Sequence, residues 1–388
     1  MKTRAAPAAV TTDQAGLETE LVRLALRAAE HHPILKAVYM GPPEWLEEAR
    51  RDPGTPAALI AEAHDLAARA DGAGSAYVAG QARSVAVQME AHEGRALPYD
   101  EMVAALLGVS IEPLDRAEME RLRDEVVEIA GGDIPGWERS RLVSGEAKWD
   151  AAMEAYAAGR RYAFGGGFPL AVEENLELIR ITDELWSVNL SWYPPRRITF
   201  EVNVATPRTP ETVAFEVAHN IYPGDYLHLA VLHQHAYRKR GHVAASIKLK
   251  NAPESVISEG IEETALLRLF ADPSRDQVLA TKLEWLRRMA TFAAALALQV
   301  EGRGEQEVLA TMAREGFMDG GRSAFQLRLI KHPLWGPYQY TYILGRKLVE
   351  DAERRVADAD RGAYLDYLYS GLHTPQTFLA GLGQIART

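Results

Sequence analysis

Histidine and carboxylate side chains recur three residues apart in the second half of this sequence, and such pairs can hold a divalent metal ion. Residues three apart on a helix share one face. The pairs are Glu216 with His219, Asp225 with His228, and Glu259 with Glu262. Because the chain contains no cysteine, any metal must be bound by imidazole and carboxylate groups. The spacing therefore indicates metal chemistry between residues 209 and 263.

The order of helix-starting and helix-breaking residues predicts how these side chains are positioned. Thr209 to Glu211 reads as a helix start, with an N-cap, a proline at the first helical position and an acid in the first turn. Pro223 must end this helix, because it lacks an N–H and crowds the carbonyl four residues back. Gly224 permits the turn, and a second helix is expected from about Asp225 to Arg240. The break places His219 against the start of that second helix.

Three ordered elements of the sequence resemble one bacterial protein family. Residues 219–226, HNIYPGDY, resemble the H-E-x-Y-P-G-H-H element of the proteins catalogued as domain of unknown function 885. Residues 241–260, GHVAASIKLKNAPESVISEG, are similar to the family's N-T-P-E-x-V-I-S-E-G stretch, and residues 340–346, YTYILGR, resemble its Y-x-x-G element. The likeness runs from Leu176 to about Ala352. It implies a zincin-like helical fold, a zinc-peptidase-like hydrolase activity, and Glu259 as the third metal ligand after the histidine positions.

The chain departs from the family pattern at the positions that carry hydrolysis. In zincins the glutamate after the first histidine takes the proton from bound water. Asn220 occupies that catalytic position here, and an amide cannot accept and return a proton at neutral pH. Asp225 and Tyr226 stand where the family has its two further histidines.

Three functional interpretations follow, and the first is a metal-dependent enzyme of metallopeptidase ancestry with an altered active site. His219, Asp225 and Glu259 would bind the metal, with His228 as a further ligand. The resemblance points to zinc, whereas so many oxygen ligands favour iron or manganese. The paired spacing also allows a dinuclear centre of the kind found in helical bundles.

The second interpretation is a catalytically inactive relative that has lost the metal and binds a ligand in the surviving cleft. The third keeps catalysis without the family's base. Asp225 or Glu262 would then take the proton, while Tyr342 and Arg346 stabilise an oxyanion. Glu263 is interpreted as surface charge.

Composition and charge limit the partners and the location. The chain has 388 residues and a formal net charge of -11. This charge argues against nucleic acid or an anionic membrane as a partner, and leaves a small-molecule or peptide-like substrate. The most apolar stretch, Met289 to Val300, is well short of the roughly 20 residues that span a bilayer, so a buried core helix is expected. Residues 1–16 lack the apolar segment of a secretory signal, which makes a cytoplasmic location the default.

The hydrophobic pattern predicts a mainly α fold with one small antiparallel sheet of about three strands. Helical spacing extends from Asp13 to Ile129, and alternation between Leu176 and Val204 indicates the strands. The strand from Ile198 to Val204 is the expected edge for an added peptide. We expect a tail over residues 1–15, a helical region over 16–150 and the zincin-like region over 151–388.

Overall fold

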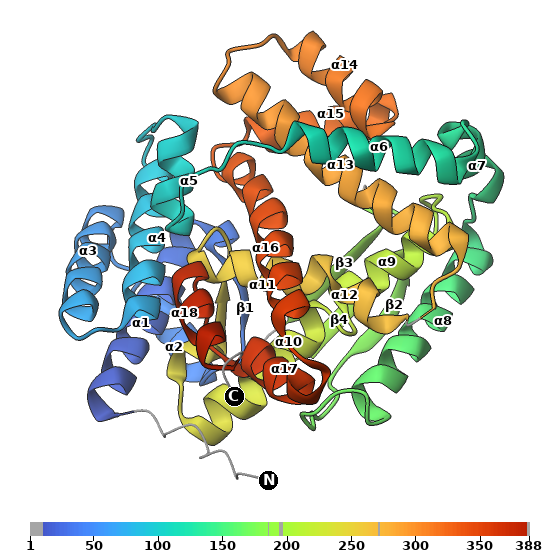
Figure 1. Ribbon diagram of the computed structural model, residues 1–388. Helices are drawn as coiled ribbons and strands as arrows, with labels where there is room; N and C mark the ends of the chain where they lie inside the picture. The colour runs from blue at the N-terminus through green and yellow to red at the C-terminus, as the bar shows by residue number, and fades with distance from the viewer. Residues whose placement is uncertain (1–10, 185, 194–196, 271, 386–388) are drawn as a thin grey trace.

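The computed structural model describes residues 11–184, 186–193, 197–270 and 272–385. It confirms a mainly helical fold with small sheets (Figure 1). The N-terminal elements are α1 (Thr12–His31), η1 (Pro33–Leu35), β1 (Lys36–Tyr39), α2 (Pro43–Arg51), α3 (Pro56–Gly72), α4 (Ala76–His92), α5 (Tyr99–Leu107), α6 (Arg116–Ala130), α7 (Ile134–Arg141) and α8 (Gly145–Phe164). Proline and glycine separate several of these helices, as between α2 and α3 at Pro53 and Gly54.

The remaining elements continue the helical pattern after a short stretch of strands. They are β2 (Glu177–Ile181), β3 (Val188–Tyr193), β4 (Arg197–Asn203), α9 (Pro210–Asn220), α10 (Asp225–Val231), the π-helix η2 (Leu232–Lys239), η3 (Val243–Ser246), β5 (Ile247–Leu249), α11 (Pro253–Glu263), α12 (Ala265–Leu269), α13 (Arg275–Gln299), α14 (Glu305–Gly316), α15 (Gly320–Lys331), α16 (Trp335–Arg355), η4 (Asp358–Asp360), α17 (Arg361–Ser370) and α18 (Pro375–Ile385).

The three predicted strands form a sheet in the order β2-β4-β3, but that sheet is mixed and not purely antiparallel. β3 and β4 pair antiparallel, with Val188 opposite Val202, whereas β2 and β4 pair parallel, with Glu177 opposite Thr199. Pro194 and Pro195, which predict a turn between the last two strands because proline is not tolerated within a central strand, lie outside the described residues. Because β4 pairs on both sides, its backbone groups are already used, so the prediction that Ile198 to Val204 offers a free peptide-binding edge is wrong.

A second sheet of two strands joins distant parts of the chain. β1 pairs antiparallel with β5, with Lys36 opposite Leu249 and Tyr39 opposite Ile247. β1 lies inside the N-terminal region that the sequence predicts as helical throughout. A strand of four residues is too short to show an alternating pattern, so its periodicity gives no signal. This pairing fixes the position of β5, and therefore of the lysines on and after it.

Helix α11 lies at the centre of the fold beside α16 (Figure 1). Every residue from Pro253 to Glu263 is buried, although four of them are glutamates. The two helices approach so closely that a Cβ atom on Gly345 would lie 2.1 Å from the carbonyl oxygen of Val256. Buried carboxylates require hydrogen-bond or ion-pair partners, and side chains from neighbouring elements of the fold supply them.

The N-terminal helices share their hydrophobic cores with C-terminal segments. Leu21 and Val78 belong to one core with Ile247, and Val103 belongs to another with Leu286. Residues before and after position 150 therefore share hydrophobic cores. The predicted boundary between two regions at residue 150 stays a prediction. The apolar stretch that begins at Met289 is buried in α13 through Ala295. Within the described residues no helix is long and apolar enough to cross a membrane.

Candidate metal centre

The helix break that positions His219 forms as the sequence predicts. The side chain of Thr209 caps α9 by accepting a hydrogen bond from the backbone N–H of Thr212, at 3.1 Å. The helix ends at Asn220, and α10 begins at Asp225. A Cβ atom on Gly224 would lie 1.8 Å from the carbonyl oxygen of His219. Glycine is therefore required at this turn, because any side chain would collide with backbone.

Three side chains converge at the end of α9 on a set of atoms that could bind one metal ion. His219 Nε2 lies 3.7 Å from Glu259 Oε2 and 3.3 Å from Glu262 Oε2. One ligand atom from each of the three residues lies within 4.8 Å of the others. Both glutamates are almost fully buried, and His219 is nearly so. The structure thus brings together the predicted ligands His219 and Glu259, and adds Glu262, which the sequence suggested as a catalytic base.

Glu263 faces the other nitrogen of the same imidazole. Its Oε1 atom lies 3.5 Å from His219 Nδ1 and 2.9 Å from the guanidinium of Arg288. Glu263 is only 1% exposed, so the interpretation of this residue as surface charge is wrong. Helix α11 is covered on all sides, so no amphipathic pattern in the sequence distinguishes its buried glutamates from exposed ones. A carboxylate behind a histidine is the arrangement that orients metal-binding imidazoles in proteins.

Tyr338 and Lys250 hold the second oxygen of Glu259. The phenol of Tyr338 donates a hydrogen bond to Glu259 Oε1. The Lys250 ammonium donates to the Tyr338 oxygen at 3.0 Å and lies 3.8 Å from Glu259 Oε1. The other carboxylate oxygen, Oε2, is buried and has no hydrogen-bond partner among the described residues. That oxygen is the one directed at His219.

Asp225 does not join the cluster as the sequence predicted, because a lysine occupies the space between them. The Lys248 ammonium lies 2.7 Å from Asp225 Oδ1 and 2.9 Å from Glu262 Oε1. Lys248 is 2% exposed. The sequence alone does not show where the Lys248 side chain points, because its position depends on the pairing of β5 with β1.

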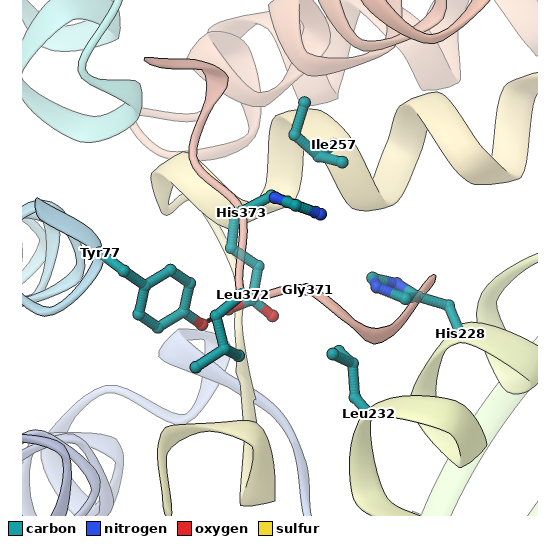
Figure 2. A pocket seen from close by; sticks show the side chains of 8 residues that line it. Tyr77, His228, Leu232, Ile257, Gly371, Leu372 and His373 are labelled. Carbon is teal, nitrogen blue, oxygen red and sulfur yellow. Dashed lines mark hydrogen bonds between the residues drawn. The ribbon is translucent and has the colours of Figure 1, made fainter. Parts of the chain in front are cut away.

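His228, the fourth predicted ligand, is directed into a different environment. It lines a small cavity together with Tyr77, Glu254 and His373, and Figure 2 shows its ring directed from α10 toward the segment from Gly371 to His373. Burial lowers the pKa of His228 to about 3, and the charge of Lys248 adds to this effect. The imidazole is therefore neutral near pH 7, outside the group of converging ligand atoms.

The contacts described for the three remaining predicted residues are with groups other than the three converging ligands. Asn220 turns back on its own helix and donates a hydrogen bond to the carbonyl oxygen of Glu216 at 2.8 Å. The ring of Tyr342 lies beneath the Arg288 guanidinium, 3.8 Å from its centre. Arg346 pairs with Glu350 at 2.6 Å and stacks on Trp285.

These contacts bear unequally on the predicted catalytic roles. Tyr342 reaches the cluster's surroundings through Arg288, which also binds Glu263. The described contacts of Arg346 do not include any member of the cluster. These contacts therefore give no geometric support for an oxyanion role of Arg346. The oxyanion role predicted for Tyr342 is compatible with the position of its side chain beside Arg288.

Burial and mutual repulsion separate the pKa values of the clustered groups. Burial raises the pKa of Glu259 to about 7, and the charge of Glu262 adds to the rise. Burial also acts to raise the pKa of Glu262, but the charge of Lys248 and the hydrogen bond with His219 outweigh it and hold the pKa well below its usual range. Burial alone would lower the pKa of His219, yet the neighbouring carboxylates raise it above its ordinary value. Without a metal, the neighbouring carboxylates thus favour the protonated form of His219.

The donor set fits a divalent ion. Ligand atoms bound to one tetrahedral zinc lie roughly 3–3.6 Å apart, given metal–ligand distances near 2.1 Å. The two distances from His219 Nε2, 3.3 and 3.7 Å, are already close to this range. The unpartnered, buried Oε2 atom of Glu259 gives an ion an oxygen that no described residue satisfies. One nitrogen and two carboxylates form a set that zinc, manganese and iron all accept.

Comparison with known proteins shows the fold and nothing finer. No family model matches the chain, and the search of curated proteins found no match. Two solved structures are similar. One is described as a "putative lipoprotein" from Colwellia psychrerythraea, with a TM-score of 0.56 and 14% identity over 85% of this chain and 67% of that one. The other is a "putative lipoprotein of unknown function" from Shewanella oneidensis, with a TM-score of 0.56 and 13% identity over 84% of this chain and 67% of that one. The resemblance to domain of unknown function 885 stays a prediction.

Proposed function

We propose that this protein is a divalent-metal-dependent hydrolase acting on a small or peptide-like substrate. One observation supports the proposal most directly: His219, Glu259 and Glu262 direct an imidazole nitrogen and two carboxylate oxygens at one point. The buried oxygen of Glu259 has no hydrogen-bond partner within the described part of the chain. The carboxylate of Glu263 also faces the second nitrogen of this imidazole. Metal-binding histidines commonly have such a carboxylate, whereas a simple salt bridge does not need one.

The residues around the centre have distinct roles under this proposal. When bound, the cation supplies Lewis acidity to a carbonyl or a water molecule. Glu263, which pairs with Arg288, faces His219 Nδ1 at 3.5 Å, and the Tyr338 phenol donates a hydrogen bond to Glu259. Burial and the charge of Glu259 raise the pKa of Tyr342 well above its ordinary value. The Tyr342 phenol therefore keeps its proton at neutral pH and can donate a hydrogen bond to a developing oxyanion.

Metal analysis of the purified protein tests the proposal before any substrate is known. The chain is stripped with a chelator, incubated separately with Zn²⁺, Mn²⁺ and Fe²⁺, desalted, and analysed by mass spectrometry. We expect about one ion per chain, and an at least 100-fold weaker affinity in His219→Ala, since even outer-shell substitutions cost about 10- to 100-fold. His64→Ala is the matched control, because His64 pairs with Glu90 on the surface. Failure of all three ions to bind would reject the enzyme.

Hydrolysis itself needs a separate measurement, because Asn220 cannot act as the family's base. A panel of peptide, ester and amide substrates should be turned over by the metal-loaded protein and not by the stripped protein. Activity that survives in His219→Ala would contradict the assignment. The donor set of one nitrogen and two oxygens also predicts that Mn²⁺ or Fe²⁺ competes with Zn²⁺ more effectively than at a site with two histidines.

The charge balance of the cluster favours one alternative, a catalytically inactive protein that binds a ligand. Four carboxylates, Asp225, Glu259, Glu262 and Glu263, lie within ion-pair distance of four cationic groups, His219, Lys248, Lys250 and Arg288. If His219 is protonated and all four carboxylates are ionised, these charges cancel without a metal. Unchanged thermal stability on addition of each metal would support this alternative. The cytoplasmic location expected from the sequence also remains a proposal.

A further inference from the structure

Glu262 uses its two oxygens for two different cationic positions. Its Oε2 atom lies 3.3 Å from His219 Nε2, at the point where the three ligands converge. Its Oε1 atom lies 2.9 Å from the Lys248 ammonium and accepts a hydrogen bond from Ser258 at 2.8 Å. A carboxylate that divides its oxygens between two cations is the bridging ligand of dinuclear metal centres.

The Lys248 ammonium also contacts a second carboxylate, that of Asp225. Asp225 Oδ1 lies 2.7 Å from the ammonium, so Lys248 is held between a terminal carboxylate and a bridging carboxylate. The lysine comes from β5, Asp225 from α10 and Glu262 from α11. All three side chains are mostly buried, with side-chain exposures of 2%, 14% and 3%. A surface ion pair would contribute little to binding or stability, but here two carboxylates removed from water depend on one cation.

We propose that Lys248 occupies the second cation position of a two-metal carboxylate site, and so restricts this protein to a single divalent ion. The inference rests on the proposed metal centre at His219, Glu259 and Glu262. An ammonium carries one positive charge and donates hydrogen bonds, whereas a metal ion would carry two charges and bind the same oxygens at about 2.0–2.2 Å. Lys248 is thus a positioning residue that fixes Glu262 and determines how many ions bind.

The proposal also accounts for the fate of the sequence-predicted ligand Asp225. A carboxylate at the start of α10 has no contact with the converging atoms, yet it points at a buried cation. If the ammonium is removed, Asp225 and Glu262 lose their shared partner and become two buried carboxylates facing one space. Such a pair is costly to bury without a cation, and a divalent ion can replace the lost charge.

The test counts metal ions in the full-length chain with Lys248 replaced by a neutral side chain of similar length. Lys248→Met, stripped and then incubated with Mn²⁺, should hold about two ions per chain, against about one in the wild type. Lys248→Arg keeps the charge and should hold one. Lys282→Met is the matched control, since Lys282 pairs with Glu125 at the surface and touches no residue of the proposed site. It should also hold one.

A second substitution identifies where the added ion binds. Asp225→Asn combined with Lys248→Met removes the terminal carboxylate of the second position, and the count should return to one. If Lys248→Met does not fold, Lys248→Asn is counted in the same way, after refolding with Mn²⁺. A folded neutral variant that holds no more ions than the wild type overturns the inference.

The outcomes separate this inference from the proposed function. One ion in both the wild type and Lys248→Met rejects the inference and leaves the metal centre intact. No ion in either protein rejects both. No ion in the wild type but one in Lys248→Met rejects the proposed function of the natural chain, while it supports Lys248 as the group that fills a cation position.

Discussion

Replacing Gly345 by alanine tests whether the contact between α11 and α16 sets the position of the carboxylate cluster. A Cβ atom at residue 345 would lie 2.1 Å from the Val256 carbonyl oxygen and 2.7 Å from the Gly260 nitrogen. Both are backbone atoms, so no side chain can rotate away. The helices must separate by about 1.3 Å to reach an ordinary contact distance of about 3.4 Å. Overpacking of this kind typically costs about 1–3 kcal/mol, and sometimes more.

The intrinsic helix preference of alanine acts in the opposite direction. Alanine is favoured over glycine in a helix by about 1 kcal/mol. A steric cost of about 3 kcal/mol, the upper end of the range for overpacking, therefore leaves a net destabilisation of about 2 kcal/mol. We expect a Tm about 2–3 °C below that of the wild type. Gly16→Ala is the matched control, because Gly16 is exposed on α1 and a Cβ atom there has no neighbour within 4 Å. That variant should be as stable as the wild type or slightly more stable.

The same substitution should weaken metal binding, because α11 carries Glu259 and Glu262 while α16 carries Tyr338. A separation of about 1 Å is large compared with the tolerance of a metal site, which is about 0.5 Å. Calorimetric titration with Mn²⁺ would measure the loss, expected to be at least tenfold. A Gly345→Ala protein with wild-type Tm and metal affinity would refute the claim that this backbone contact positions the cluster.

Three further predictions concern single residues. Burial lowers the pKa of His373 to about 4, so the folded state resists a proton that the unfolded chain accepts near pH 6.5. Stability should therefore fall as the pH drops from 6.5 to 4, by up to about 3 kcal/mol from this group, and urea unfolding of His373→Gln should show a weaker pH dependence. Tyr338→Phe removes the donor to Glu259 and should weaken Mn²⁺ binding about 10- to 100-fold by calorimetry, whereas Tyr340→Phe should not. Lys148 is fully buried and donates to the carbonyl oxygens of residues 203 and 206 at 2.7 and 2.9 Å. Lys148→Met should lower the free energy of unfolding by about 3 kcal/mol in urea, whereas a neutral residue at the exposed Lys347 should change it little.

The sequence by itself determined the features that depend on neighbouring residues. The cap at Thr209 and the helix break at Pro223 and Gly224 follow from backbone geometry and missing hydrogen-bond donors, which are local properties. The positions of β2, β3 and β4 follow from alternation within a few residues. The helix break located His219, whereas its pairing with Glu259 was implied by the family resemblance and agrees with the structure. Glu262 was expected at the site as a proton acceptor and not as a member of the converging set.

Tertiary structure decided which charges face one another. Lys248 reaches Asp225 and Glu262 only because β5 pairs with β1, more than 200 residues earlier in the chain. The parallel pairing of β2 with β4, and the burial of Glu263 behind His219, likewise depend on segments that no local pattern connects. Periodicity specifies the conformation of a segment, whereas its partners are selected by packing and by the pairing of buried charges across the whole fold.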